Sequence, residues 1–397
     1  MSSKLGYKQT EIGEVPEEWG IKKLGDIISL EYGRSLPVQK RIDGKIPVFG
    51  SNGIVGFHNE SMVTQPGIVV GRKGTVGAIQ WVTTNFWAID TTYYISVKDD
   101  KMNLKWLYYL LIFLELHRLN AATGVPGLNR VECYSQIIRL PPAHEQDIIA
   151  SILSIVDDAI EKTAENIAKA LTLKKGLMHQ LLIKGVGHTR FKQTEIGEIP
   201  EEWKINILSS ICEKPEYGYT QSAKEAQTGI KFLRITDIQD GKVDWNTVPY
   251  CECSDDLFLK YQLHEGDILF ARTGATTGKS LLIRNVPKAV FASYLIRVRP
   301  TREITPEFLQ YFFNSQYYWH QISQKKVGSA QSGINASILS TLVIQTPPII
   351  EQQKITRILL SIDGDIENMS RISCNLLEIK EGLMRGLLTG RLRAKVN

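Results

Sequence analysis

The sequence contains no apolar segment long enough to cross a membrane. Its longest apolar run, Trp106–Leu116, is interrupted by Glu115 and followed by His117, whereas a transmembrane helix needs about 20 predominantly apolar residues. The first residues, MSSKLGYKQT, also lack the apolar core of a secretory signal peptide. These absences predict a soluble, cytoplasmic protein that has no membrane partner.

Cysteine is scarce, and its placement excludes a fold built on disulfides or zinc. The count of five is odd, which argues against a secreted disulfide scaffold. One residue separates Cys251 from Cys253, whereas zinc knuckles place about two to four residues between paired ligands. No second Cys or His pair follows at ligand spacing. We expect ordinary strand or loop cysteines, no metal and no cofactor.

Enzyme signatures are incomplete or missing. The segment from Gly274 to Ser280, GATTGKS, resembles a phosphate-binding loop, but its glycines stand one residue closer together than in G-x-x-x-x-G-K-S/T. Pro287 also follows too soon for the helix that would present its N-terminus to phosphate. The Pro-Pro pairs at 141–142 and 347–348 lack the flanking residues of a methyltransferase motif. Glu378-Ile-Lys380, which looks like the tail of a nuclease motif, lies inside an expected helix as ordinary surface charge. The chain is therefore expected to be non-catalytic.

The composition, in contrast, provides enough apolar residues to build a core. The 397 residues, 43% of them hydrophobic, suffice for two or more domains. The net charge of +5 is a mild excess of basic residues. Such an excess permits a local basic face that binds nucleic acid, but it does not require one.

The strongest signal is an internal repeat. The segment Tyr7–Trp19, YKQTEIGEVPEEW, recurs as Phe191–Trp203, FKQTEIGEIPEEW, with 11 of 13 positions identical. Two further matches join LPPAHEQ at 140–146 to TPPIIEQ at 346–352, and GLMHQLL at 176–182 to GLMRGLL at 382–388. The two halves therefore share their ends and differ in their middles. Shared ends indicate one scaffold built twice, whereas divergent middles indicate two surfaces that do similar work on different targets.

Each middle has the pattern of a mixed α+β globule. Short β-branched or aromatic runs are bounded by Gly, Pro and Asn. We expect strands at 44–50, 67–71 and 91–97 in the first half, and at 230–235, 266–271 and 290–298 in the second. A helix is expected after each set, near 103–119 and 305–324.

After each Pro-Pro pair the sequence predicts a long helix. Apolar residues recur at a spacing of three to four along 145–183 and 351–388, and neither segment contains a proline. The apolar positions are Ile149, Ile152, Val156, Ala159, Ile167, Leu171, Met178 and Leu181, and then Ile355, Ile358, Ile362, Met369, Leu376, Ile379 and Leu383. We predict that the two helices pack against each other as an antiparallel coiled coil. The alternative is that each helix packs on its own domain.

Such a pair of helices would hold two globules apart. At a rise of about 1.5 Å per residue it would form a rod of roughly 55 Å. The predicted boundaries are 1–142 for the first globule, 143–185 for the first long helix, 186–347 for the second globule and 348–397 for the second helix with its tail.

This organisation resembles the specificity subunit of type I restriction–modification systems. The shared motifs are G-E-[VI]-P-E-E-W, [LT]-P-P-x-x-E-Q and G-L-M-x-x-L-L, together with PVFGSNG from Pro47, GRKG from Gly71, GDIL from Gly266 and ARTG from Ala271. The resemblance covers essentially the whole chain. It implies two tandem target recognition domains that are separated by an antiparallel pair of long helices, in a pseudo-twofold internal repeat.

The resemblance also implies partners. Members of the family read a bipartite, asymmetric site in double-stranded DNA. Two methyltransferase subunits would dock on the scaffold and methylate adenine, and a restriction/translocase subunit would complete the complex. The chain itself would supply no catalytic residue.

Candidate DNA-binding residues lie in loops that correspond between the halves. Arg, Lys, Asn and Gln read base edges, while Arg, Lys, Ser, Thr and backbone N–H groups bind phosphates. The candidates are Arg34, Gln39, Lys40, Arg41, Ser51, Asn52, Arg72, Lys73, Gly74 and Thr75 in the first half, and Tyr219, Gln221, Lys224, Arg272, Thr273, Gly274, Lys279, Lys325 and Lys326 in the second. The alternative for each is an ordinary turn or a solvated basic loop.

Two further predictions are structural. The loops at 123–129 and 325–335 correspond through Asn129 and Asn335, which we expect to act as cap or turn residues. The repeated Trp19 and Trp203 are expected in the core rather than stacked on bases.

A non-DNA adaptor, with duplicated protein-binding domains on a coiled-coil spacer, remains the alternative function. DNA binding that is sensitive to salt would distinguish the two.

Overall fold

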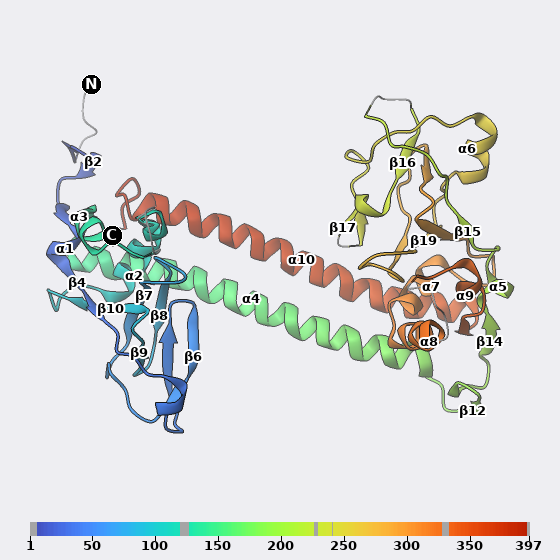
Figure 1. Ribbon diagram of the computed structural model, residues 1–397, viewed down its shortest axis with the longest axis horizontal. Coiled ribbons are helices and arrows are strands. Elements are labelled where there is room, and N and C mark those ends of the chain that lie inside the picture. The colour runs from blue at the N-terminus through green and yellow to red at the C-terminus, as the bar shows by residue number, and fades with distance from the viewer. Residues whose placement is uncertain (1–5, 120–126, 226–228, 240, 328–332, 395–397) are drawn as a thin grey trace. The chain divides into compact units, whose positions relative to one another are not determined.

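The computed structural model describes residues 6–119, 127–225, 229–239, 241–327 and 333–394 (Figure 1). The chain forms two compact units. Unit 1 comprises residues 1–165 and 370–397, and unit 2 comprises residues 166–369. Both long helices therefore contribute one segment to each unit.

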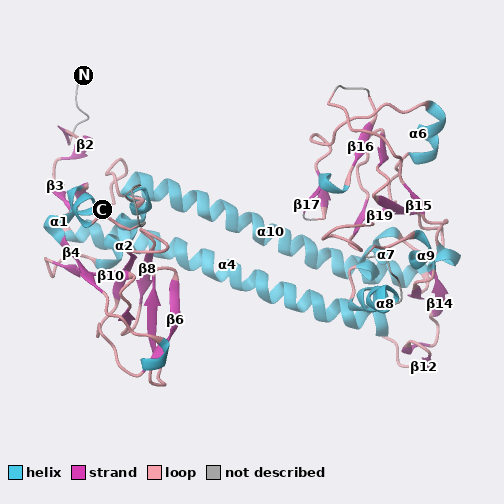
Figure 2. Ribbon diagram, in the orientation of Figure 1, coloured by secondary structure: helices cyan, strands magenta, loops and turns pink. Residues whose placement is uncertain are grey.

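Unit 1 is built on a four-stranded antiparallel sheet (Figure 2). Its strand order is β4 (Ile28–Tyr32), β10 (Thr92–Val97), β7 (Gly67–Gly71) and β8 (Ile79–Val82). Every residue of β7 is buried, because this strand lies inside the sheet and is covered on both faces. Helix α2 (Leu104–Phe113) adds Trp106 and Tyr109 to the core.

The remaining elements of unit 1 are short. They are β1 (Tyr7–Thr10), β2 (Gly13–Pro16), β3 (Gly20–Lys23), α1 (Leu24–Ile27), η1 (Val38–Lys40), β5 (Ile46–Gly50), β6 (Gly53–His58), β9 (Trp87–Ala88), η2 (Leu116–Leu119), α3 (Arg130–Ser135) and β11 (Ile137–Leu140).

Unit 2 repeats the same sheet with different strands. Its order is β15 (Glu216–Tyr217), β22 (Leu295–Val298), β19 (Ile268–Ala271) and β20 (Ser280–Leu282). The hairpin β12 (Phe191–Thr194) with β13 (Gly197–Pro200) and the pair β14 (Lys204–Ile207) with β23 (Val343–Thr346) repeat the pairs β1–β2 and β3–β11 of unit 1. The predicted internal repeat is therefore confirmed at the level of strand order.

The units differ in what is added to this sheet. Unit 1 carries the three-stranded sheet β6-β5-β9, whereas unit 2 carries the parallel pair β16 (Lys231–Leu233) with β21 (Ala289–Phe291). The other elements of unit 2 are α5 (Leu208–Ile211), η3 (Ile235–Asp237), β17 (Ile238–Gln239), β18 (Lys242–Val243), α6 (Asp255–Tyr261), α7 (Pro306–Phe313), α8 (Gln316–Val327) and α9 (Ala336–Ser340). The divergent middles of the sequence correspond to these additions.

Three elements expected as continuous are divided. The run 290–298 forms β21 and β22, because a turn in which the Leu295 N–H donates to the Ala292 carbonyl separates them. The helix expected at 103–119 ends at Phe113 and gives way to η2, since Glu115 takes a left-handed φ of 48°. The helix expected at 305–324 is divided into α7 and α8.

The repeated sequence motifs meet at a buried tryptophan–glutamate hydrogen bond in each unit, which we call the joint. The indole N–H of Trp19 donates to a carboxylate oxygen of Glu145 at 2.8 Å, and Trp203 donates to Glu351 at 2.9 Å. Both tryptophans are fully buried. The prediction that they belong to the core is confirmed, and the Glu of each P-P-x-x-E-Q motif is explained as their acceptor.

The two long helices run antiparallel within each unit. They are α4 (Ala143–Lys184) and α10 (Ile349–Leu387). In unit 1, Asp157 pairs with Lys380 at 2.6 Å, while Glu145, nearer the start of α4, reaches Arg393 beyond the end of α10. In unit 2, Lys174 pairs with Asp363 at 2.5 Å. The predicted antiparallel packing is confirmed.

The apolar seam of these helices is only partly buried. Ile149 and Leu153 join the core of unit 1, and Ile355 and Leu359 join that of unit 2. In contrast, Leu171, Ile358 and Ile379 are exposed, by 51%, 37% and 51%. Placing those three residues on the helix–helix seam was therefore wrong. Among the described residues, no helix is both long and apolar enough to span a membrane.

Candidate nucleic-acid interface

The hairpin loops after β7 and β19 occupy the same place in the two units. Residues 72–78 join β7 to β8, and residues 272–279 join β19 to β20. Gly74 and Gly274 have φ values of 76° and 83°, a region that glycine tolerates best. The exposed side chains of these loops are Lys73, Thr75, Thr273, Ala275, Thr276 and Lys279. The loops therefore correspond, as the sequence predicts, whereas their contact with DNA stays a prediction.

The first arginine of each loop stacks on a tyrosine. The Arg72 guanidinium carbon lies 5.0 Å from the centroid of the Tyr32 ring, and that of Arg272 lies 4.9 Å from the centroid of Tyr217. Such cation–π contacts orient a guanidinium without neutralising it. The tyrosines are 49% and 39% exposed, so packing of a core does not explain why both units keep them.

The glycine after each tyrosine has a separate, structural reason. A Cβ at Gly33 would overlap the carbonyl oxygen of Ile89, and one at Gly218 would overlap that of Ala292.

Tyr32 was not among the candidate residues predicted from the sequence. The signal that reveals it is the tripeptide Glu-Tyr-Gly, which occurs at 31–33 and again at 216–218.

In unit 1 a second arginine joins the stack. Arg130 lies 5.1 Å from the centroid of Tyr32, and its guanidinium donates to the Tyr134 hydroxyl at 3.0 Å. Hydrogen bonds with Arg130 and Tyr93 lower the pKa of Tyr32, and burial raises the pKa of Tyr93 to about 12. The phenol of Tyr93 therefore stays neutral at pH 7, and hydrogen bonds with Tyr134 and Tyr32 raise the pKa of Arg130, which keeps its charge.

The family comparison agrees with the duplicated architecture. The family of the type I restriction modification DNA specificity domain matches residues 16–171 and again residues 200–376. This chain belongs to that family. The two matches account for the repeat, since one specificity domain falls in each half.

Relatives and solved structures extend the comparison to the whole chain. The specificity subunit of the type I restriction enzyme MjaVIII from Methanocaldococcus jannaschii is 27% identical, over 98% of this chain and 96% of that protein. The EcoBI specificity subunit of Escherichia coli is 26% identical, over 83% and 75%. The crystal structure of the S subunit of a type I system from M. genitalium superposes with a TM-score of 0.64 at 16% identity, over 93% and 96%. That likeness shows a shared fold.

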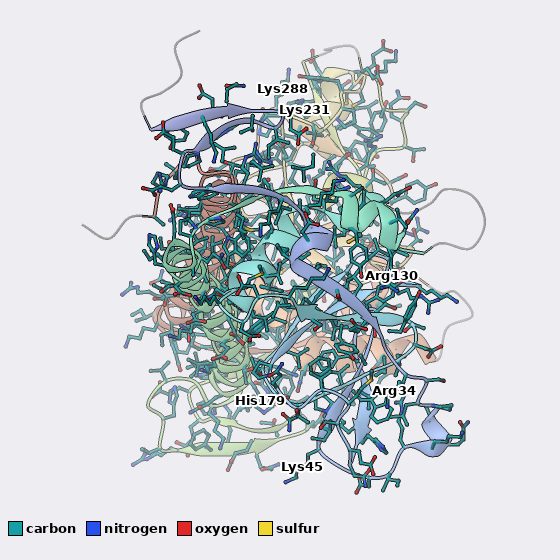
Figure 3. All side chains as sticks on the ribbon, turned by 90° about the vertical axis from the view of Figure 1, so that its left-hand side faces the viewer. Arg34, Lys45, Arg130, His179, Lys231 and Lys288 are labelled. Carbon is teal, nitrogen blue, oxygen red and sulfur yellow. The ribbon has the colours of Figure 1, made fainter. Side chains whose placement is uncertain are left out.

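In the first specificity domain, one more predicted loop lies near the Arg72 hairpin. Ser51 and Asn52 form the turn between β5 and β6, and a Cβ at Gly74 would lie 3.3 Å from the Ser51 hydroxyl oxygen. Figure 3 shows Arg34 and Arg130 toward the same side of unit 1. The structure thus brings the Ser51 turn to the Arg72 loop.

The predicted residues of the loop 34–41 differ in their exposure and in their hydrogen bonds. Arg34, Gln39 and Lys40 are exposed. Arg41 instead donates to the carbonyl oxygens of Leu36 at 3.2 Å and Val55 at 2.6 Å. Arg41 therefore fastens the loop to β6, which gives it a structural role whether or not it contacts DNA.

In the second specificity domain the predicted residues form more contacts with other side chains of the protein. Lys224 pairs with Glu252 at 2.5 Å, and the Lys325 ammonium donates to the Thr341 hydroxyl at 2.9 Å. Tyr219 stacks on Tyr261 at 5.4 Å. Gln221 donates to the Tyr219 hydroxyl at 3.3 Å. The side chain of Lys326, with residues 123–126 and 328–332 of the two corresponding loops, lies outside the described residues.

The Asn residues of those two loops are helix caps. The Asn129 side chain accepts hydrogen bonds from the Val131 and Glu132 N–H groups, and Asn335 accepts from Ile338. This is the role expected from the sequence.

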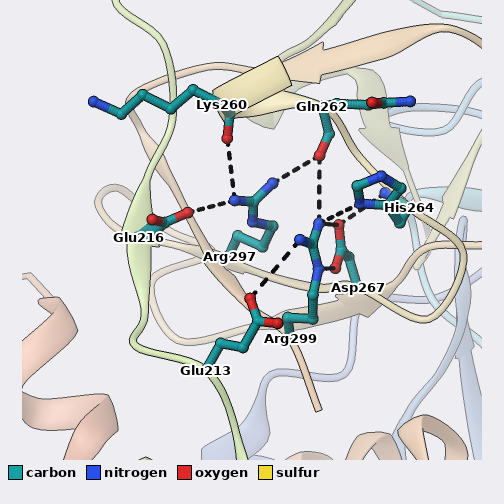
Figure 4. Close-up of polar contacts among 8 residues, drawn as sticks. All are labelled: Glu213, Glu216, Lys260, Gln262, His264, Asp267, Arg297 and Arg299. Carbon is teal, nitrogen blue, oxygen red and sulfur yellow. Dashed lines mark hydrogen bonds and ion pairs between the residues drawn. The ribbon is translucent and has the colours of Figure 1, made fainter. Parts of the chain in front are cut away.

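Two arginines of unit 2 are fully occupied by the fold. Arg297 is buried, pairs with Glu216 and donates to the Gln262 carbonyl at the end of α6 (Figure 4). Arg299 forms two hydrogen bonds to Asp267, and these raise its pKa. Arg297 holds α6 and β15 against β22, and Arg299 is held by Asp267, so neither is a candidate for DNA.

The segment that resembles a phosphate-binding loop is a hairpin. Lys279 is followed by strand β20 and not by a helix, so no helix N-terminus faces the glycines. Within the described residues, no group of three or more His, Cys, Asp or Glu side chains is placed to hold a metal ion.

Proposed function

We propose that this chain is the DNA-reading specificity subunit of a type I restriction–modification system. The observation that carries the proposal is the duplicated tyrosine–arginine hairpin, which both units present on the same sheet while the neighbouring elements differ. Membership of the specificity domain family and the names of the relatives favour this function over a protein-binding adaptor. A recognition role needs no catalytic residue in this chain.

Each unit would read one half of a bipartite, asymmetric site. We assign the two target recognition domains to residues 1–142 and 186–347, and the scaffold to the helices at 143–185 and 348–397. The different additions to the shared sheet support two different half-site sequences. Base edges would be read by the exposed loop residues. In unit 1 these are Arg34, Gln39, Lys40, Asn52 and Lys73, and in unit 2 they are Gln221, Thr273 and Lys279, with the half-buried Tyr219 beside Gln221.

The long helices would dock two methyltransferase subunits. Leu171 and Leu173 are 51% and 57% exposed in unit 2, and Leu377 and Ile379 are 53% and 51% exposed in unit 1. The second pair lies 206 residues after the first, the same offset as the P-P-x-x-E-Q and G-L-M-x-x-L-L motifs. The two residues of each pair point to different sides of their helix, so we propose that one of them in each half forms the contact. An apolar position that is exposed twice suits two copies of one partner.

Chemistry would come entirely from those partners. The methyltransferase subunits would methylate adenine in the recognised site, and a restriction/translocase subunit would cleave DNA. We place this assembly in the cytoplasm, where such a system meets the DNA that it modifies.

The decisive experiment is to map methylated adenines in DNA treated with the reconstituted methyltransferase complex. We expect one motif made of two unlike parts separated by unread bases. Exchanging residues 30–140 for those of a relative should change one part and leave the other. The reciprocal exchange of residues 216–340 should do the converse. A continuous motif, or a change in both parts after one exchange, would contradict the assignment.

A further inference from the structure

Arg72 and Arg130 form a pair of cations on one aromatic ring. Their guanidinium carbons lie 5.0 Å and 5.1 Å from the Tyr32 centroid, and both lie 5.9 Å from the Tyr93 centroid. Each is also fixed by a neutral hydrogen-bond acceptor. Arg72 donates to the Asp90 carbonyl at 2.9 Å, and Arg130 donates to the Tyr134 hydroxyl at 3.0 Å.

This pair has no anionic partner. Among the described residues, no carboxylate lies within ion-pair distance of Arg72 or Arg130. Other arginines of the chain differ, since Arg234, Arg299 and Arg393 each hold a carboxylate. Two like charges held near one ring repel each other, and among the described residues this repulsion is offset by aromatic rings and neutral hydrogen-bond acceptors, with no carboxylate paired to either arginine.

The equivalent place in unit 2 has one arginine only. Arg272 stacks on Tyr217 as Arg72 stacks on Tyr32, but the residue after the capping Asn335 is Ala336, where Arg130 follows Asn129. The backbone N–H of Ala336 donates to the Tyr217 hydroxyl at 3.1 Å. The framework is therefore the same in both units, and the second cation is present in one.

We infer that Arg72 and Arg130 together bind the phosphate backbone of DNA beside the half-site that unit 1 reads, and that unit 2 lacks the Arg130 contact. This inference rests on the proposed function. Phosphate is favoured over a base edge because an anion offsets the repulsion between the guanidinium groups, whereas a neutral base edge does not. Tyr32 would orient the pair before DNA arrives.

The test is the salt dependence of DNA binding. The full chain, assembled with its methyltransferase subunits, is titrated by fluorescence anisotropy against a labelled duplex with the mapped motif and against a scrambled duplex. Each phosphate contact contributes about 0.9 to the slope of log K against log salt concentration. We expect R130A to lower this slope by about 1 on both duplexes and to leave the methylated sequence unchanged.

Three further variants keep the test informative if R130A folds poorly. R130K retains the charge, so we expect a slope close to that of the wild type. A336R adds the missing cation to unit 2 at a half-buried position, and should raise the slope by about 1. R118A is the matched control, because Arg118 is an exposed arginine of unit 1 that pairs with Glu115. It should change nothing.

The outcomes separate this inference from the proposed function. If the wild-type complex binds DNA but neither R130A nor A336R alters the slope, the phosphate contact is overturned and the proposed function is not. A changed methylation motif in R130A would also overturn it, because Arg130 would then read a base. A wild-type complex that does not bind DNA would overturn the proposed function, and this inference with it.

Discussion

Glu145 is the residue on which the joint of unit 1 depends. Its carboxylate is almost fully buried and accepts hydrogen bonds from Trp19 and Arg393. Burial alone would raise the pKa of Glu145, but the hydrogen bonds from Arg393 and Trp19 outweigh it and the pKa is lowered. In unit 2 the equivalent Glu351 is held by Trp203 and His188.

The lowered pKa of Glu145 predicts a loss of stability in acid. A carboxyl with a pKa below its usual 4.5 contributes stability above that pH and loses it as the pH falls through the lowered value. We expect E145Q to lower the free energy of unfolding at pH 7 by about 3 kcal/mol, because Arg393 loses its buried partner. The variant should also lose part of the acid dependence below pH 4.5. Thermal unfolding followed by circular dichroism from pH 7 to pH 3 measures both effects.

The exposed Glu115 provides the control for this measurement. E115Q removes a carboxylate that pairs with Arg118 at the surface, where such pairs contribute about 0–1 kcal/mol. If E145Q and E115Q lost the same stability and kept the same acid profile, the joint would not depend on the ionised Glu145.

At this scale the sequence predicted some roles and missed others. The burial of Trp19 and Trp203 follows from a repeated aromatic residue in a shared scaffold. The structural role of Arg41 does not follow from its type, because a loop arginine that binds backbone carbonyls has the same sequence signature as one that is free to bind DNA.

Among the elements, helix α4 stabilises unit 1 through one of its faces. Leu153 is fully buried in the core of unit 1, whereas Ile155, two residues later, is 65% exposed. A residue two positions along a helix points away from the first. Substituting each of the two residues therefore distinguishes the stability that core packing contributes from the stability that the helix itself contributes.

This contrast gives a matched pair of variants. We expect L153A to lower the free energy of unfolding by about 3 kcal/mol, since it removes buried volume from the core. I155A should change it by less than about 0.5 kcal/mol. Urea unfolding of both variants measures the difference. Equal losses would mean that α4 packs differently from the arrangement described.

The long helices were predictable because their signal is periodic and uninterrupted. The boundaries of the strands were less predictable, as the run 290–298 shows. Most of its residues favour strand, but the turn between Ala292 and Leu295 is fixed by hydrogen bonds, including one from the Ser293 N–H to the carbonyl of Tyr219, which is distant in the sequence.

For the whole molecule, the exposed pairs on the long helices predict how many partners bind. We expect L171D with L173D to remove one methyltransferase subunit from the assembled complex, because charged residues would replace an apolar contact. L377D with I379D should remove the other, and the combined variant should bind neither. Light scattering of the purified complexes measures their mass.

A charge on the same helix that is not on these pairs provides the control. Glu161 is exposed on α4, ten residues before Leu171, and E161K should leave the mass of the complex unchanged. Loss of both methyltransferase subunits from either double variant would mean that the docking points are not independent.

The sequence alone determined the duplicated plan of this protein. Near-identical segments must fold alike and an apolar period of three to four residues favours a helix, so the scaffold and the long helices were predictable, while the recognition role followed from the resemblance to the family. Only the tertiary structure decided which residues form the cluster of Tyr32, Arg72 and Arg130. These residues are distant in the sequence and meet because β10 pairs with both β4 and β7, while α3 brings Arg130 to the same ring. Which strands pair is set by the packing of the whole core, and local sequence does not encode it.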